Sequence, residues 1–411
     1  MIKFLITILG FAVFIRNYIK GRLISSSSLW TLCYLLIFVL FPVASSEEYS
    51  RHDVIDALAL IGIVSFFLGA LFGSKIKIWY HNDKITMRDR CPSFKIAKIG
   101  FITVYILTMI LIAQSIGTSG IKAIFAGALT SKQIALSGES SVLEFVQQLL
   151  VPCLLCMWIS AETYKQKRNC VAFTALYLVE MFFFSFTRLF SFCTLIIILL
   201  FVIRNMEKKR QAICIGIATI AMSVLLVVIN FVRCLGMGGF QWSDIFNIES
   251  FLSGTDFGAA YKYFNVEIQH EPALINPIVY FKWLYCFIPR SLWPGKPETI
   301  NIQIMKTILP NLVSTGFSAG TSVLGEAYAF LGYIGIALYP FVWGVVCEAL
   351  DRKYYDRLTM GYDHCMGNIL YYIFAVFIVI SGQRGDWSLY LIIIVWLYFL
   401  PIYLMTKYRV K

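Results

Sequence analysis

Apolar runs of about twenty residues recur along the whole chain and leave it few folds to choose from. Runs such as 54–74 and 324–348 carry few charges and are long enough, as helices, to cross the hydrocarbon core of a bilayer, about 30 Å thick. Only 14% of the 411 residues are charged, against about 25% in a typical soluble protein. The sequence therefore predicts an all-α, polytopic integral membrane protein, with residues 1–411 in a single transmembrane bundle.

Apolar periodicity predicts about eleven membrane spans. The run 170–203 is too long for one of them, because a single helix over it would measure about 50 Å. It is interrupted at Thr187 and Arg188, so we expect a hairpin with Arg188 at its tip. The spans are predicted at 2–19, 29–44, 54–74, 99–116, 142–160, 170–186, 189–203, 212–232, 324–348, 366–381 and 387–405.

The positions of Lys and Arg predict the orientation of these spans. If the N-terminus is outside, most of the 35 Lys and Arg residues fall in short connections on the inner side, as the positive-inside rule requires. The net charge of +12 is then topological, and we expect no nucleic-acid partner. The outer connection 233–323, between the eighth and ninth spans, is long, and apolar spacing within it predicts short helices at the membrane surface.

Five cationic residues lie on the predicted outer face, where the positive-inside rule does not call for them. Guanidinium groups match phosphate oxygens and stay charged, so the set predicts a site for a pyrophosphate. In the stretch "CFIPRSLWPGKPET", three prolines restrict the backbone and would hold two of these cations in place, while Trp293 is suited to the headgroup level or to a sugar face. The five are Arg188, Arg233, Arg290, Lys296 and Arg384.

Each of these arginines also has a structural interpretation. Arg188 would extend to water at the hairpin tip, Arg233 would anchor a helix end at the interface, and Arg384 would pair with Asp386. A shared anionic ligand accounts for all of them together, and it is the interpretation we favour.

Glu326, in "GTSVLGEAYAFLG", is the candidate catalytic base. It lies at the start of an apolar span between Gly325 and Ala327, whose small side chains leave room for a substrate. The alternative is a structural role, because a carboxylate near a helix N-terminus is favoured by the helix dipole. The chain has no nucleotide-binding, zinc-protease or paired C-x-x-C motif, so we expect no cofactor and no metal.

These motifs resemble those of the Wzy-type polymerases, which join the oligosaccharide repeat units of bacterial O-antigens and capsule-like polysaccharides. The resemblance rests on "FIPRSLWPGKP" followed by "GTSVLGEAYAFLGYIGI", on "FSFTRLF" at the hairpin tip, and on "ISGQRGDW" before the last span. Its sharpest part covers residues 286–336. The general plan of many spans with one large outer loop is similar over most of the chain.

The resemblance implies a GT-C-like membrane glycosyltransferase of the bacterial inner membrane, with its active face toward the periplasm. Donor and acceptor would both be undecaprenyl-pyrophosphate-linked repeat units on the outer leaflet, and the four arginines and Lys296 would hold the pyrophosphates. Glu326 would deprotonate the acceptor hydroxyl, and Trp293, Asp256 and Tyr261 would contact the sugars. The partners would be the lipid bilayer and a chain-length regulator and flippase of the same pathway.

Two other functions fit a similar plan. An O-antigen ligase moves polymer from the same carrier to lipid A core and resembles this chain in its outer arginines, but typically relies on a histidine in the large loop, where His270 is the candidate. A flippase for lipid-linked oligosaccharides would bury its charges at the midplane and keep its loops short. Apart from Glu180 and Asp56, this chain instead concentrates charge at the outer rim, beside a long loop. We therefore expect chemistry at the membrane surface.

Overall fold

The structure is a computed structural model, and the part of the chain that it describes is mostly helical and contains no strand. Within that part, six helices are long and apolar enough to cross a membrane. At this level the prediction of an all-α membrane protein is confirmed. The described residues are 1–22, 24–44, 51–76, 90–125, 140–181, 188–204, 206–207, 210–211, 213–214, 216–217, 256–270, 274–313, 319–361, 365–385 and 387–407.

The membrane-length helices coincide with six of the predicted spans. They cover Ile2–Ile19, Ser26–Val43, His52–Lys75, Phe94–Gln114, Ser322–Thr359 and Tyr390–Lys407. The spans predicted at 142–160, 189–203 and 366–381 correspond to shorter apolar helices. The span predicted at 170–186 corresponds to a helix that ends at Glu180, and 212–232 lies mostly outside the described residues. The total of eleven therefore stays a prediction.

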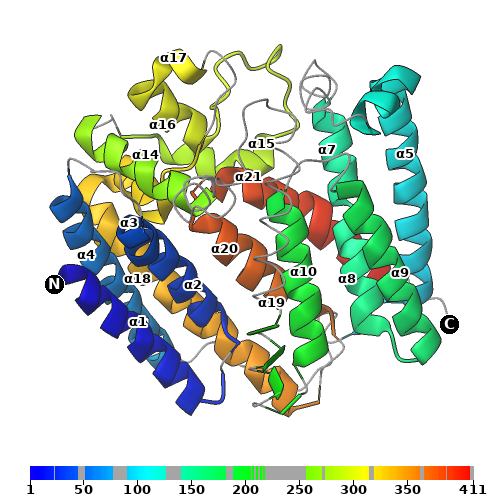
Figure 1. Ribbon diagram of the computed structural model, residues 1–411, viewed down its shortest axis with the longest axis horizontal. Helices are drawn as coiled ribbons and strands as arrows, with labels where there is room; N and C mark the ends of the chain where they lie inside the picture. The colour runs from blue at the N-terminus through cyan, green and yellow to red at the C-terminus, as the bar shows by residue number, and fades with distance from the viewer. Residues whose placement is uncertain are drawn as a thin grey trace. The chain divides into compact units, whose positions relative to one another are not determined.

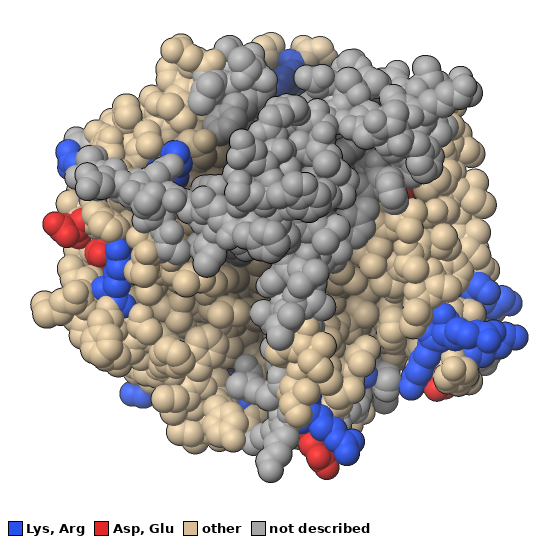
Figure 2. All heavy atoms as spheres, viewed as in Figure 1, with Lys and Arg blue, Asp and Glu red and all other residues tan. Residues whose placement is uncertain are grey.

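Most of the coloured surface in Figure 2 carries neither acidic nor basic side chains. Large apolar side chains such as Phe4, Leu68 and Ile106 are exposed on the long helices. Exposed apolar surface of this extent is costly in water and is typical of helices that face lipid. The surface therefore agrees with a membrane-embedded protein.

The chain forms two compact units. Unit 1 comprises Met1–Asp83, Asn247–Gly361 and Tyr371–Ile392, and unit 2 comprises Lys84–Phe246, Tyr362–Leu370 and Ile393–Lys411. The single transmembrane bundle expected from the sequence stays a prediction.

The helices α1 (Ile2–Ile19), α2 (Ser26–Leu35), α4 (His52–Lys75) and α18 (Ser322–Thr359) of unit 1 lie side by side (Figure 1). The π-helix η1 (Leu36–Leu40) and the short α3 (Phe41–Ala44) continue α2. The closest packing joins α4 and α18, where a Cβ added to Gly69 would overlap the Phe341 carbonyl oxygen and one added to Gly344 would overlap that of Phe66. Glycine is required here because the two backbones are nearly in contact.

Helix α18 is broken at Gly332, which adopts a non-helical conformation with φ 61° and ψ −145°. The first segment is enclosed by protein, since every residue from Ala319 to Phe330 is buried. The carbonyl of Ala329, just before the break, accepts a hydrogen bond of 2.8 Å from the Ile275 N–H. Non-helical backbone at membrane depth is tolerated only where protein or a water-filled cavity satisfies it, and such breaks commonly mark binding sites.

The described residues of the predicted outer loop 233–323 form five short helices, where short helices were expected. Ile300, Ile304, Met305 and Ile308 of one of them form an apolar core with Val279 of another and with Ala329 and Phe330 of α18. Their position at the membrane surface stays a prediction. They are α14 (Asp256–His270), the 3₁₀ helix η4 (Pro277–Phe281), α15 (Lys282–Tyr285), α16 (Ile300–Ile308) and α17 (Pro310–Val313).

Later in unit 1, α19 (Met366–Ile373), the π-helix η5 (Phe374–Ile378) and α20 (Val379–Gly382) lead to a turn, after which α21 (Trp387–Ile392) begins. The first residues of α19 belong to unit 2. Both α15 and η4 pack against α21. The helices η4 and α15, which precede the proline-rich loop, therefore lie next to α21, which follows the turn containing Arg384.

In unit 2, a capping box between Thr163 and Gln166 fixes the start of α9. The Trp158 indole N–H donates to Thr174 at 2.9 Å, and the Tyr398 hydroxyl donates to Gln148 at 2.7 Å. These bonds join separate helices of the unit. Its helices are α5 (Phe94–Phe125), α7 (Ser140–Gln148), α8 (Leu150–Ser160), α9 (Tyr164–Glu180), α10 (Arg188–Ile203), the π-helix η6 (Ile393–Phe399) and α22 (Leu400–Lys407).

Candidate functional site

Glu326 lies in the buried first segment of α18 and is itself fully buried. Its Oε1 atom accepts hydrogen bonds from the hydroxyls of Tyr280, at 2.7 Å, and Tyr339, at 3.1 Å. Its Oε2 atom lies 3.4 Å from the backbone N–H of Trp387. Glu326 thus joins α18 to η4, which precedes the proline-rich loop, and to the start of α21, which follows Arg384.

The segment before α18 crosses the turn that contains Arg384. The Ser322 N–H donates to the Arg384 carbonyl at 3.1 Å, and the Val323 N–H donates to the Gln383 carbonyl at 3.0 Å. A Cβ on Gly320 would overlap the Arg384 carbonyl oxygen. The crossing therefore satisfies helix N-terminal donors that would otherwise be orphaned, and it fixes the backbone of Arg384 against α18.

Ser322 is strained at this crossing. Its φ is 73°, a left-handed value that costs a non-glycine residue about 1 to 3 kcal/mol. Gly385, across the turn, has φ 93°, which glycine adopts without that cost. Strain of this kind persists only where surrounding contacts impose it, and it is concentrated at functional sites.

A second carboxylate, Glu267 of α14, faces the same segment. It is fully buried, and neither of its oxygens has a hydrogen-bond partner among the described residues. Oε2 of Glu267 and Oγ1 of Thr321 would each lie 2.5 Å from a Cβ on Gly325. Burial raises the pKa of Glu267 well above its ordinary value of 4.5; the Thr321 hydroxyl lowers it by a smaller amount, and the charge of Glu326 raises it again.

The proline-rich loop is closed on itself. The ammonium group of Lys296 donates to the carbonyls of Cys286, at 2.7 Å, and Ile288, at 2.8 Å, which leaves one of its three hydrogens for a ligand. The Arg290 guanidinium donates to the Lys296 carbonyl at 3.3 Å and is otherwise exposed. The ring of Trp293 packs against that of Tyr285 at 5.1 Å. The loop therefore presents Arg290 outward from a fixed backbone.

Four further residues were singled out by the sequence. Arg188 is the first residue of α10, in unit 2, and Arg233 lies outside the described residues. Asp256 begins α14. Tyr261 is fully buried, and its hydroxyl lies 2.7 Å from Nδ1 of His52. Unit 1 thus positions Glu326, Arg384 and the loop carrying Arg290 and Lys296 around one segment of α18.

The hydrogen bonds of His52 define its tautomer. The Lys3 ammonium can only donate, so Nε2 of His52 accepts its bond of 2.8 Å. A neutral ring then carries its proton on Nδ1 and donates to the Tyr261 oxygen. Tyr261 is held as part of the buried packing between α14 and α4, and its assignment to sugar contact stays a prediction.

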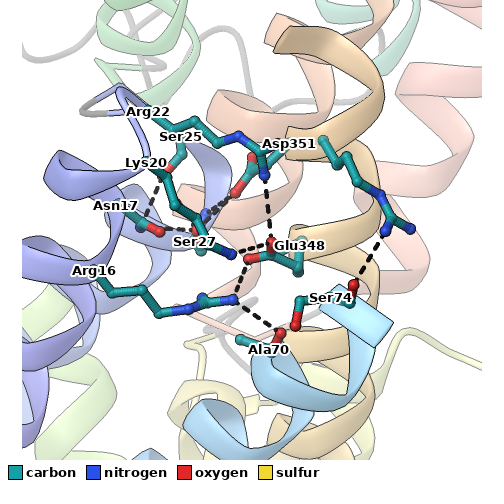
Figure 3. A network of polar contacts seen from close by, with 12 residues as sticks. Arg16, Asn17, Lys20, Arg22, Ser25, Ser27, Ala70, Ser74, Glu348 and Asp351 are labelled. Atoms are coloured by element: carbon teal, nitrogen blue, oxygen red, sulfur yellow. Dashed lines mark hydrogen bonds and ion pairs between the residues drawn. The ribbon is translucent and has the colours of Figure 1, made fainter. Parts of the chain in front are cut away.

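A second polar cluster lies near the other end of α18 (Figure 3). The buried carboxylate of Glu348 forms ion pairs with Arg16 at 2.8 Å, Lys20 at 2.9 Å and Arg22 at 3.3 Å. One turn further on, Asp351 accepts hydrogen bonds from the backbone and hydroxyl groups of Ser26 and Ser27 at the start of α2. The cluster ties α1 and α2 to α18. Lys20 and Arg22 lie between the first two predicted spans, and Arg16 lies at the end of the first.

Sequence reasoning missed Glu267 and the Glu348 cluster. An acidic residue inside an otherwise apolar span, as Glu348 is, was the available signal. Comparison of the chain with family models, with curated proteins and with solved structures finds no match. The polymerase resemblance therefore rests on the sequence motifs alone.

Proposed function

We propose that the protein is a membrane glycosyltransferase that polymerises undecaprenyl-pyrophosphate-linked oligosaccharide repeat units on the outer leaflet of a bacterial inner membrane. The observation that carries the proposal is the junction at Glu326, where a buried carboxylate holds together the elements leading to the Arg290 loop and to Arg384. The Arg290 loop and the turn with Arg384 both connect to Glu326. Two such cationic segments suit a pyrophosphate that must be bound and then stabilised as a leaving group.

The surface around the loop supports a substrate held in the membrane. Apolar side chains recur every three or four residues from η4 through the loop and are exposed, up to 66% for Phe287 and 78% for Leu292. Exposed apolar groups beside cations are typical of segments that lie at the headgroup level, with the apolar side chains in the acyl region. The exposed set is Leu274, Ile278, Phe281, Leu284, Phe287, Ile288 and Leu292.

In this arrangement, Arg290 and Arg384 would neutralise the pyrophosphate as the glycosidic bond to it breaks. Their planar guanidinium groups donate paired hydrogen bonds to phosphate oxygens. The acceptor hydroxyl of the incoming unit would attack the anomeric carbon and lose its proton to a base, for which Glu326 is our candidate. Glu326 is enclosed in this conformation, so the acceptor would have to enter beside Tyr280 and Tyr339.

Replacement of Arg290 by Ala tests the cationic loop. Arg290 is exposed and makes one backbone bond within the loop, so the variant should fold normally. Loss of a charge-assisted hydrogen bond, about 1.5 to 3 kcal/mol, should reduce polymer formation by about 10- to 100-fold. The assay is extension of lipid-pyrophosphate-linked repeat units by purified protein in proteoliposomes. Lys306→Ala, at an exposed cation of α16 paired with Glu298, is the matched control, and equal losses in both variants would count against the loop.

Replacement of Glu326 by Gln tests the base. Gln still accepts hydrogen bonds from Tyr280 and Tyr339 but cannot take a proton, so we expect kcat to fall by about 100-fold or more with little change in KM. Tyr280→Phe removes a hydrogen bond to Glu326 and leaves its carboxylate in place. If Tyr280→Phe reduces kcat as strongly as Glu326→Gln, Glu326 positions the junction and is not the base. If Glu326→Gln still makes polymer of full length, Glu326 is neither the base nor a positioning residue.

A flippase for the same lipid-linked units is the second candidate. The observation that favours it is the pair of fully buried carboxylates, Glu267 and Glu326, because buried acids in membrane proteins often carry protons during transport. A polymerase makes longer glycans in detergent, where there are no two sides to transport between. A flippase instead moves a labelled lipid-linked unit across proteoliposomes without lengthening it.

A further inference from the structure

Glu267 lies in a site that does not offset a negative charge. It is 0% exposed, and neither carboxylate oxygen has a hydrogen-bond partner among the described residues; the nearby Thr321 hydroxyl lowers its pKa by less than burial raises it. None of the ion pairs among the described residues includes it. An ionised carboxylate that is buried without partners is so costly that the group takes up a proton instead.

Its neighbour Glu326 is placed differently. Glu326 accepts from two tyrosine hydroxyls and lies near a backbone N–H of α21. It also lies in the second turn from the N-terminus of α18, where the helix dipole favours an anion. Two neighbouring acids with such unequal surroundings divide the roles, so that one is charged and the other is neutral.

On the described residues of the elements packed against α14, no cation forms an ion pair with Glu267. The apolar elements η1 and α3 contain no titratable residue. On α16, the exposed Lys306 pairs with Glu298 at 2.6 Å. On α14 itself Lys262 and His270 are exposed, whereas Glu267 is buried. The titratable or charged groups on its own and adjoining elements include Glu326 and Tyr339 of α18, Tyr280 of η4, Lys306 of α16, Tyr261, Tyr263, Lys262 and His270 of α14, and His52, which bonds Tyr261. Arg384 lies beside the segment before α18, with its Cγ 2.9 Å from a Cβ on Gly320.

We propose that Glu267 is a proton-binding site, which holds a proton at neutral pH so that the Glu267–Glu326 pair carries one negative charge and not two. The bound proton allows α14 to pack against the first segment of α18. When Glu267 loses it, a second anion faces Glu326 across that contact, and α14 and α18 repel each other. The proposal is independent of glycosyl transfer, because it concerns the charge state of the fold itself.

Infrared spectroscopy of the purified protein tests the proton directly. A protonated carboxylic acid has a C=O stretch that an ionised carboxylate lacks, and the band shifts in D₂O. We expect wild type to show such a band at neutral pH and Glu267→Gln to lose it. Glu162→Gln, at an exposed acid before α9, is the control and should keep it. An identical spectrum for wild type and Glu267→Gln would overturn the proposal.

Thermal unfolding against pH gives a second readout. Because the pKa of Glu267 is raised above its ordinary value of 4.5, native protein binds more protons than unfolded protein as the pH rises above that value, and wild type should lose stability. Glu267→Gln lacks this loss, so its Tm relative to wild type should rise with pH and then level off. At acid pH, below 4.5, the two should agree. Parallel Tm curves across the whole range would contradict the proposal.

A bound sodium ion could neutralise Glu267 in place of a proton. If the proton assignment is right, wild type should give the same Tm in sodium chloride and in choline chloride at equal ionic strength. If sodium alone raises the Tm, and Glu267→Gln abolishes the rise, the site binds sodium and the proton assignment is wrong.

Discussion

Replacement of Gly344 by Ala should disrupt the packing of α18 against α4 in unit 1. The added Cβ would overlap the Phe66 carbonyl oxygen and lie 2.7 Å from the backbone nitrogen of Ala70. Both are backbone atoms of α4, so no side chain can rotate away and the two helices must separate. Overpacking costs about 1 to 3 kcal/mol, and a backbone obstacle places this variant at the upper end.

The measurement is the Tm of detergent-purified protein. It is obtained from the size of the monodisperse peak in size-exclusion chromatography after heating to a series of temperatures. At about 2 to 4 °C per kcal/mol, we expect Gly344→Ala to lower the Tm by about 5 to 10 °C. Gly216→Ala is the control, because Gly216 is also helical and nothing lies within 4 Å of an added Cβ. An unchanged Tm for Gly344→Ala would mean that α4 and α18 are not in close contact in the protein.

Much of the fold of unit 1 follows from hydrophobicity. Apolar runs long enough to cross a bilayer are expected to form helices, because a backbone in the hydrocarbon core has no water to bond and must satisfy its own hydrogen bonds. The ranges 2–19 and 54–74 therefore matched helices closely, and 324–348 lies within a longer helix that ends at Thr359. The break inside α18 was not predicted, since a single glycine in an apolar run is common in membrane helices. At the break, Ile275, far away in the sequence, donates a hydrogen bond to the Ala329 carbonyl, and sequence periodicity does not reveal such a tertiary contact.

The candidate site was predictable only in part, because apolar periodicity says which residues are helical but not which helix faces meet. The position of Glu326 at the start of an apolar helix was read correctly from the sequence, and its catalytic role stays a prediction. Its contacts with Tyr280 and Trp387 depend on how α18 packs against η4 and α21. Glu267 lies in the predicted outer loop 233–323, and tertiary packing makes it fully buried.

Replacement of Glu348 by Ala should be the most damaging change of a single charge. Glu348 is buried and is the shared partner of Arg16, Lys20 and Arg22. Its loss would leave three cations together without their counterion, two of them mostly buried, and would free α1 from α18. Breaking a buried ion pair by removing one partner costs about 3 to 5 kcal/mol, and the removal here affects three pairs at once.

The measurement is again the Tm in detergent, at low and high salt. Salt should recover part of the loss, because screening weakens the repulsion among cations that the missing carboxylate leaves exposed to ions. Glu207→Ala is the matched control, since Glu207 and Arg210 form an ion pair at 3.9 Å with both side chains exposed, and such a pair contributes about 1 kcal/mol or less. If Glu348→Ala were as mild as Glu207→Ala, the cluster would not hold α1 and α2 to α18. A large loss that salt partly restores would show that the charge of Glu348, more than its packing, joins these helices at the end of α18 opposite the candidate site.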